Sequence, residues 1–177
     1  MSLFENPTQA VGIFAFLTAF FGCVMAGRST GWIIWRWLTA LYLVFAIELM
    51  VGLRHGLRVM VNDVMQSAEI YSDRAVIQWA LVLVLLALVL ALSSRYLIRA
   101  RKFGSLSKTR FAAIAATVAL ISVFLLELIS FHEIDALLYQ KFASVMVIGW
   151  IWAGLAIAVM ISGLSELVHE SSLLNSK

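Results

Sequence analysis

The chain alternates between long apolar runs and short polar segments. A helix needs about 20 apolar residues to cross a bilayer, and five runs come close to that length. They cover residues 8–27, 32–53, 75–94, 111–131 and 142–164. The pattern predicts an all-α integral membrane bundle of five transmembrane helices, with residues 1–177 forming a single transmembrane domain.

The polar segment between the second and third runs, residues 54–74, keeps apolar residues at helical spacing. These are Leu57, Val61, Val64, Met65 and Ala68. Such spacing in a polar segment is typical of an amphipathic helix that lies along the membrane surface. The polar tail, residues 164–177, is expected to form a short surface helix that frays.

Composition supports the membrane class. Hydrophobic residues make up 63% of the chain and charged residues 13%, and the mean hydropathy is +0.98. Soluble domains have about 45–50% apolar and about 25% charged residues.

Cys23 is the only cysteine, which excludes an intrachain disulfide and a cysteine-cluster metal site. The net charge of +3 does not indicate a nucleic-acid partner, because the basic residues are concentrated in one loop.

The distribution of Lys and Arg predicts the orientation, because cytoplasmic loops are enriched in both. The strongly basic loop is residues 95–110. We therefore expect a multi-pass protein of the bacterial inner membrane, with its N-terminus outside and its C-terminus inside. Arg54, Arg58 and Arg74 would then lie outside, where acidic neighbours partly offset them.

With this topology, three polar residues on three helices share one depth. Glu48, Gln78 and Glu127 each lie a few residues below the outer end of a span, roughly 6–9 Å deep at 1.5 Å per residue. An ionised side chain in the middle of a span costs about 2.5–3.5 kcal/mol and is normally paired or faces an aqueous cavity. We therefore expect at least one Glu–Arg pair, with Arg54 or Arg74 as the cation.

Together with residues at the outer boundary, this layer forms the candidate site. Its members are Glu48, Arg54, His55, Tyr71, Arg74, Gln78, Glu127, Ser130, His132 and Asp135. The cluster could stabilise helix contacts through ion pairs and hydrogen bonds, or it could contact an ion, a proton or a small ligand. No catalytic residue and no cofactor is predicted.

Metal and haem binding remain open at the same cluster. The candidate metal ligands are Glu48, His55, Glu127 and His132, and the two histidines are the candidates for haem. The Glu-x-x-His spacing of dimetal bundle proteins is absent. The stretch His132-Glu133-Ile134-Asp135 lacks the second histidine of a zinc protease motif.

The fifth run carries small residues. Gly149 and Gly154, with nearby alanines, predict a closely packed helix face. Self-association through this face, or contact with other membrane protein subunits, is expected.

Two short patterns involve the same polar residues. Tyr71, Arg74 and Gln78 form Tyr-x-x-Arg-x-x-x-Gln, and residues 130–135 form Ser-x-His-x-x-Asp. Both resemble signatures in a broad group of uncharacterised bacterial multi-span membrane proteins, over about a third of the chain at motif level. The chain departs from that group where an Arg pair usually precedes the Gln, since only Arg74 is present. The resemblance implies a helical bundle of about five spans whose motif residues act together, and it implies no activity.

Three functions follow as hypotheses. The first is a structural or helper subunit of a larger membrane assembly, because the loops are too short for a soluble catalytic domain. The second is a module that binds or transports an ion, a proton or a small ligand. The third is a membrane enzyme in which Glu127 or His132 is a general base and Arg74 binds an anionic group.

Overall fold

The computed structural model describes residues 6–52, 56, 107–129 and 136–175, with isolated positions between 80 and 98. Its labelled elements are α1 (Pro7–Thr30), α2 (Ile33–Val51), α5 (Lys108–Ile129), β1 (Lys141–Phe142), β2 (Val145–Met146) and α7 (Val147–Asn175). Within the described residues, four helices are long and apolar enough to cross a membrane. The protein is therefore a helical bundle of the membrane class, as the apolar pattern predicts.

The count of five spans stays a prediction. The expected third span, 75–94, is described only at isolated positions, and the expected amphipathic helix, 54–74, only at Gly56.

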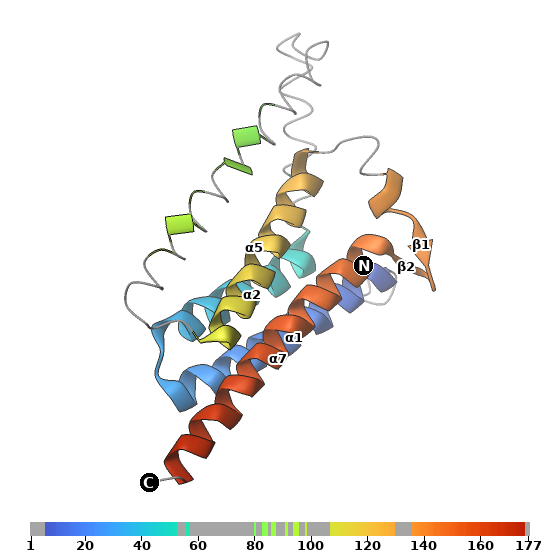
Figure 1. Cartoon of the computed structure of the whole chain (residues 1–177). Coiled ribbons are helices and arrows are strands. Elements are labelled where there is room, and N and C mark those ends of the chain that lie inside the picture. Colours follow the sequence, from blue (N-terminus) through green and yellow to red (C-terminus); the bar gives the residue numbers. More distant parts are fainter. Residues whose placement is uncertain are drawn as a thin grey trace.

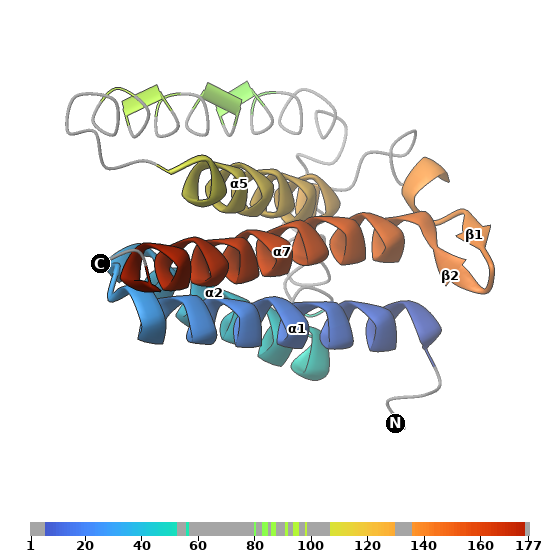
Figure 2. The ribbon, with the colours of Figure 1, turned by 60° about the horizontal axis from the view of Figure 1, so that its bottom comes forward.

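Helices α1 and α7 form the centre of the bundle. Helix α1 packs against α2 and α7, and α7 also packs against α5 (Figures 1 and 2). Helices α2 and α5 run in the same direction, opposite to α1 and α7. We call the end where α1 stops and α2 and α5 begin the basic end. The opposite end, which carries β1 and β2, is the hairpin end.

Local sequence sets the ends of α1 and α2. The Asn6 side chain accepts hydrogen bonds from the backbone N–H groups of Thr8 and Gln9, at 3.2 and 3.4 Å, and Pro7 occupies the first turn. This arrangement satisfies N–H groups that have no partner within the helix. Gly31 ends α1 and Gly52 ends α2, each in the left-handed conformation (φ 69° and 72°). Glycine adopts that conformation at little cost, so both stops are encoded in the sequence.

The last predicted span, 142–164, is wrong at its start. Residues 142–146 belong to an antiparallel hairpin in which Lys141 pairs with Met146 and Phe142 with Val145. The backbone N–H of Met146 donates to Thr8 Oγ1 at 2.9 Å, which joins the hairpin to α1. A run of apolar residues does not reveal such a strand, because strand and helix both tolerate it.

The two central residues of the hairpin loop, Ala143 and Ser144, have positive φ values of 51° and 68°. Positive φ at both positions is the geometry of a type I′ turn, which favours Asn-Gly. A non-glycine residue in this conformation costs about 1–2 kcal/mol. We expect Ser144→Gly to raise the free energy of unfolding by about 1 kcal/mol, measured by denaturation in mixed micelles. Equal or lower stability would contradict the turn geometry.

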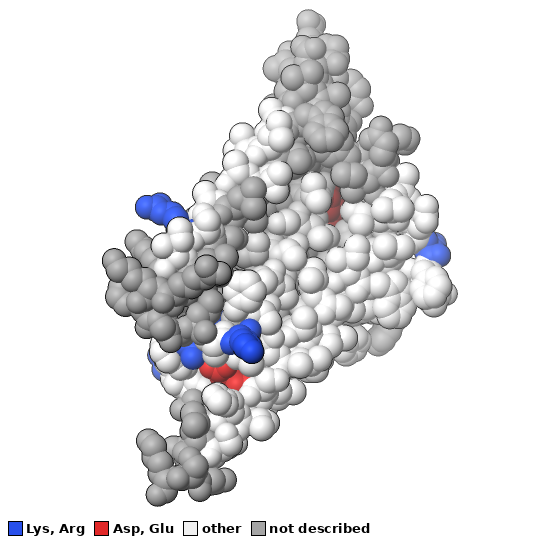
Figure 3. Space-filling model, in the orientation of Figure 1, with Lys and Arg blue, Asp and Glu red and all other residues white. Residues whose placement is uncertain are grey.

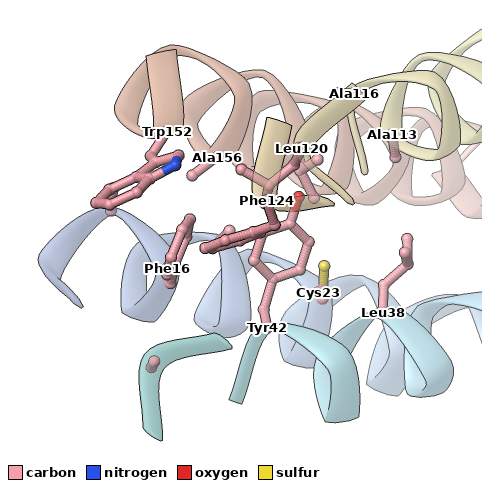
Figure 4. Close-up of a cluster of buried hydrophobic side chains, with 14 of the residues drawn as sticks. Phe16, Cys23, Leu38, Tyr42, Ala113, Ala116, Leu120, Phe124, Trp152 and Ala156 are labelled. Atoms are coloured by element: carbon pink, nitrogen blue, oxygen red, sulfur yellow. The ribbon is translucent and has the colours of Figure 1, made fainter. Parts of the chain in front are cut away.

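The core is built around Phe16 of α1, which is fully buried. Its ring lies 5.7–6.3 Å, between centroids, from four aromatic rings on the three other labelled helices. These rings belong to Tyr42, Phe45, Phe124 and Trp152. Tilted rings at such separations interact favourably beyond their contact area. Figure 4 shows Phe16, Tyr42, Phe124 and Trp152 meeting between the helices. One residue of α1 therefore joins all four described long helices.

Close contact between α1 and α7 depends on two glycines. A Cβ atom placed on Gly163 would lie 2.8 Å from the backbone oxygen of Gly22. Packing through small residues is common between membrane helices. The predicted pair behaves differently: Gly149 is buried against Thr8 and Val145, whereas Gly154 is exposed, and a Cβ atom placed on it would meet no described neighbour within 4 Å. The predicted role of these two glycines in self-association stays a prediction.

Candidate functional site

The structure describes two members of the predicted polar layer, Glu48 on α2 and Glu127 on α5. The other eight lie outside the described residues: Arg54, His55, Tyr71, Arg74, Gln78, Ser130, His132 and Asp135. The expected pairing of a glutamate with Arg54 or Arg74 therefore stays a prediction.

A ring contact sets the relative depth of the two glutamates. Phe45 and Phe124 meet with their centroids 4.9 Å apart. Glu48 and Glu127 each follow one of these rings by three residues, and α2 and α5 run in the same direction. Residues three apart lie on the same side of a helix, about one turn apart. Both carboxylates therefore lie about one turn beyond the same aromatic contact, toward the hairpin end.

Hydrogen-bonding groups surround this part of the bundle. The Tyr139 hydroxyl donates to Oε1 of Glu127 at 3.5 Å, and both residues are half-buried. Glu48 is also half-buried, and its Oε2 atom is inaccessible to solvent. The side-chain amide of Gln9 donates to the backbone oxygen of Leu49, the residue after Glu48. Carboxylate oxygens in such surroundings can accept protons or hydrogen bonds and can contact a cation.

No group of three His, Cys, Asp or Glu side chains that could hold a metal ion occurs in the part of the chain that the structure describes. Two of the four candidate metal ligands, His55 and His132, lie outside that part. The metal and haem interpretations therefore remain predictions about residues whose positions are not described.

A second polar cluster, which the apolar pattern does not predict, lies at the basic end. Glu166 of α7 is 4% exposed, and Arg110 of α5 donates through Nε to its Oε1 at 2.9 Å. Ser107 donates to Oε2 of Glu166 at 2.8 Å, and Thr109 donates to the same oxygen. We call Ser107, Thr109, Arg110 and Glu166 the α5–α7 cluster. It satisfies both oxygens of a buried carboxylate, as a buried charge requires.

The local structure of α5 positions three of these groups. Ser107 precedes the helix, and its hydroxyl oxygen accepts from the backbone N–H of Arg110 at 3.2 Å, which is the geometry of an N-cap. The same oxygen accepts from Nε of Arg110 at 3.0 Å. The guanidinium also lies over the Trp32 ring, with Cζ 4.0 Å from the centroid. Since stacking and hydrogen bonds fix its plane, Arg110 is held in place for the carboxylate.

The helical spacing of the buried residues in α7 indicates that Glu166 is buried as well. Buried positions of α7 include Trp152, Ala156, Val159 and Gly163, spaced three or four residues apart. The next step of this spacing falls on Glu166, which is buried on the same face. The polar tail is predicted to be a short surface helix that frays, but α7 continues without a break to Asn175. Polar composition does not distinguish a surface helix from the polar end of a long helix, whereas the helical spacing continues through Glu166.

A third polar contact lies inside the bundle, between α2 and α5. The hydroxyl oxygens of Tyr42 and Thr117 are 3.2 Å apart, and both residues are buried. Thr117 donates its single proton to the backbone oxygen of Ala113 at 2.7 Å. Tyr42 is therefore the donor in the contact with Thr117.

Because Tyr42 is the donor, Thr117→Val and Tyr42→Phe should lower the free energy of unfolding by different amounts. Thr117→Val leaves the buried Tyr42 hydroxyl without its acceptor, which costs about 1–3 kcal/mol. Tyr42→Phe removes the donor, and Thr117 still bonds to Ala113, so a loss of about 0.6 kcal/mol is expected, typical of hydrogen bonds between membrane helices. Unfolding in mixed micelles measures both. A larger loss for Tyr42→Phe would contradict the assignment.

No known protein family, curated protein or solved structure matches this chain.

Proposed function

We propose that the protein is a structural or helper subunit of a larger membrane assembly, in the bacterial inner membrane. The observation that carries this proposal is that polar side chains of the bundle form contacts from one helix to another. Arg110 with Glu166 joins α5 to α7, Tyr42 with Thr117 joins α2 to α5, and Gln9 joins α1 to α2. Such contacts stabilise one arrangement of the helices, and a rigid bundle suits a partner that must be held in place.

The outer surface of α2 supports the same proposal. Ile33, Trp37, Val44 and Val51 are 58–69% exposed, and their spacing places them on one face. An apolar face of this kind is compatible with lipid and with an apolar transmembrane helix of a partner. The proposal predicts a protein contact on at least one such face.

The test is photo-crosslinking in native membranes. A benzophenone amino acid at Val44 of α2 should give a crosslinked band containing a distinct protein, which mass spectrometry can identify. A matched variant carries the same probe at Phe14 of α1, which is 64% exposed, and reports which face contacts the partner. Crosslinks to lipid alone at both positions, with no protein after gentle purification, would contradict the subunit proposal.

A second candidate function is the binding of a cation, a proton or a small ligand at the hairpin end. It is favoured by the placement of Glu48 and Glu127 one turn beyond the Phe45–Phe124 contact, on two different helices. Here Glu127→Gln separates the possibilities, because it keeps the shape of the side chain and removes its charge. A severe loss of stability would indicate a structural carboxylate. Unchanged stability with lost proton or cation uptake in vesicles would indicate a binding site.

A further inference from the structure

The basic end gathers cationic side chains from three helices that are separate in the sequence. Arg28 lies in the last turn of α1, Arg36 in the first turn of α2 and Lys108 at the first position of α5, and all three are exposed. Figure 3 shows Lys and Arg side chains over this end of the molecule, at the lower left of the view.

Contacts between α1 and α2 place Arg36 beside the last turns of α1, the helix that carries Arg28. The turn between these helices is only Gly31 and Trp32. A Cβ atom placed on Gly27 would lie 3.9 Å from Cγ of Arg36. The stem of Arg36 therefore lies against α1 beside the residue that precedes Arg28.

Trp32, in the turn between α1 and α2, also contacts α5. Trp32 lies under the guanidinium of Arg110, at 4.0 Å from its ring centroid to Cζ. Lys108 is two residues before Arg110 in the same helical turn. The contact of Trp32 with Arg110 therefore joins the α1–α2 turn, near Arg28 and Arg36, to the first turn of α5, which carries Lys108.

The buried carboxylate of this end does not neutralise the exposed cations. Glu166 is 4% exposed, and its oxygens are occupied by Arg110, Ser107 and Thr109. In the part of the chain that the structure describes, the one ion pair at this end is that of Arg110 with Glu166, and the exposed side chains of Arg28, Arg36 and Lys108 can face an anion outside the bundle. Trp32 and Trp37 are 41% and 69% exposed. Tryptophan side chains are enriched at the membrane–water interface, at the level of the lipid headgroups.

We propose that the basic end binds the headgroup of an anionic phospholipid, with its phosphate between Arg28, Arg36 and Lys108 and its glycerol region beside Trp32. The charge, the exposed indoles and the position at the end of apolar helices together fit a lipid better than a soluble anion. This site does not depend on the proposed subunit function, because it requires only that the helices lie in a membrane.

The test is native mass spectrometry of the full-length protein released from detergent with phosphatidylglycerol or phosphatidylcholine of equal chain length. The wild type should retain phosphatidylglycerol preferentially. Neutralising the cations (Arg28→Gln, Arg36→Gln and Lys108→Gln) should weaken retention about fivefold for each charge near the membrane surface. The matched control, Lys141→Gln, removes an exposed cation at the hairpin end and should leave retention unchanged.

Two further measurements complete the test. Arg28→Lys with Arg36→Lys keeps the charge and should keep the preference, and its loss would overturn the charge-based assignment. Inorganic phosphate at matched concentration should fail to displace the lipid, and full displacement would show that the site recognises free phosphate. Equal retention of both lipids by the wild type, or equal weakening by Lys141→Gln, would overturn the proposal.

Discussion

Glu166→Gln is expected to lower the free energy of unfolding by about 3 kcal/mol. The change removes the negative charge of a buried pair whose cation, Arg110, is 12% exposed. Breaking a buried pair in this way typically costs about 3–5 kcal/mol, and the lower end applies here because Trp32 still contacts the guanidinium. Unfolding in mixed micelles, followed by circular dichroism, measures the loss.

The matched control replaces both partners. Arg110→Met with Glu166→Leu removes both charges and keeps the approximate volume, so most of the stability should return. Lys141→Gln, at an exposed position of the hairpin, should change stability by less than about 0.5 kcal/mol. If the double variant lost as much as Glu166→Gln, the α5–α7 cluster would owe its stability to the Ser107 and Thr109 hydrogen bonds rather than to the charge pair.

Gly163→Ala should destabilise the protein by about 2 kcal/mol. A Cβ atom there would lie 2.8 Å from the oxygen and 3.0 Å from the carbonyl carbon of Gly22. These are backbone atoms, so α1 and α7 must separate to make room, and overpacking of this kind costs about 1–3 kcal/mol. Unfolding in mixed micelles again provides the measurement.

Gly154→Ala is the matched control, since it makes the same change in the same helix. The described residues leave space around Gly154, and alanine favours the helix over glycine by up to about 1 kcal/mol. Equal or higher stability is therefore expected for Gly154→Ala. Destabilisation of Gly154→Ala equal to that of Gly163→Ala would show that the α1–α7 contact is not the cause. A change in oligomeric state with Gly154→Ala would instead support the predicted self-association face.

The apolar pattern predicted a bundle of long apolar helices, and four helices long and apolar enough to span a membrane occur among the described residues. The ends of α1 and α2 depend on local sequence. Asn6 with Pro7 begins α1, and Gly31 and Gly52 end α1 and α2 as left-handed residues. The hairpin at Lys141–Met146 was missed, because its two central residues are not the Asn-Gly that usually marks such a turn.

For the polar residues too, the sequence predicted some features, and only the packing of the helices decided the others. The positions of Glu48 and Glu127 in their spans already predicted one depth for both, and the structure adds the ring contact of Phe45 with Phe124 one turn away from them. The pattern predicts Arg110 in the basic loop, residues 95–110, and Glu166 in the polar tail, residues 164–177, since both lie in polar segments. Their pairing joins residues 56 positions apart in the sequence, and only the packing of α5 against α7 decides it.

The sequence by itself determined the membrane class, the two ends of α1 at Asn6 and Gly31, and the end of α2 at Gly52, because hydropathy and capping act over a few neighbouring residues. The tertiary structure alone decided which polar groups meet. It brought Glu166 to Arg110 and Trp32, and it gathered Arg28, Arg36 and Lys108 at one end. Burial of a charge depends on the helices around it, and that arrangement is a property of the whole bundle.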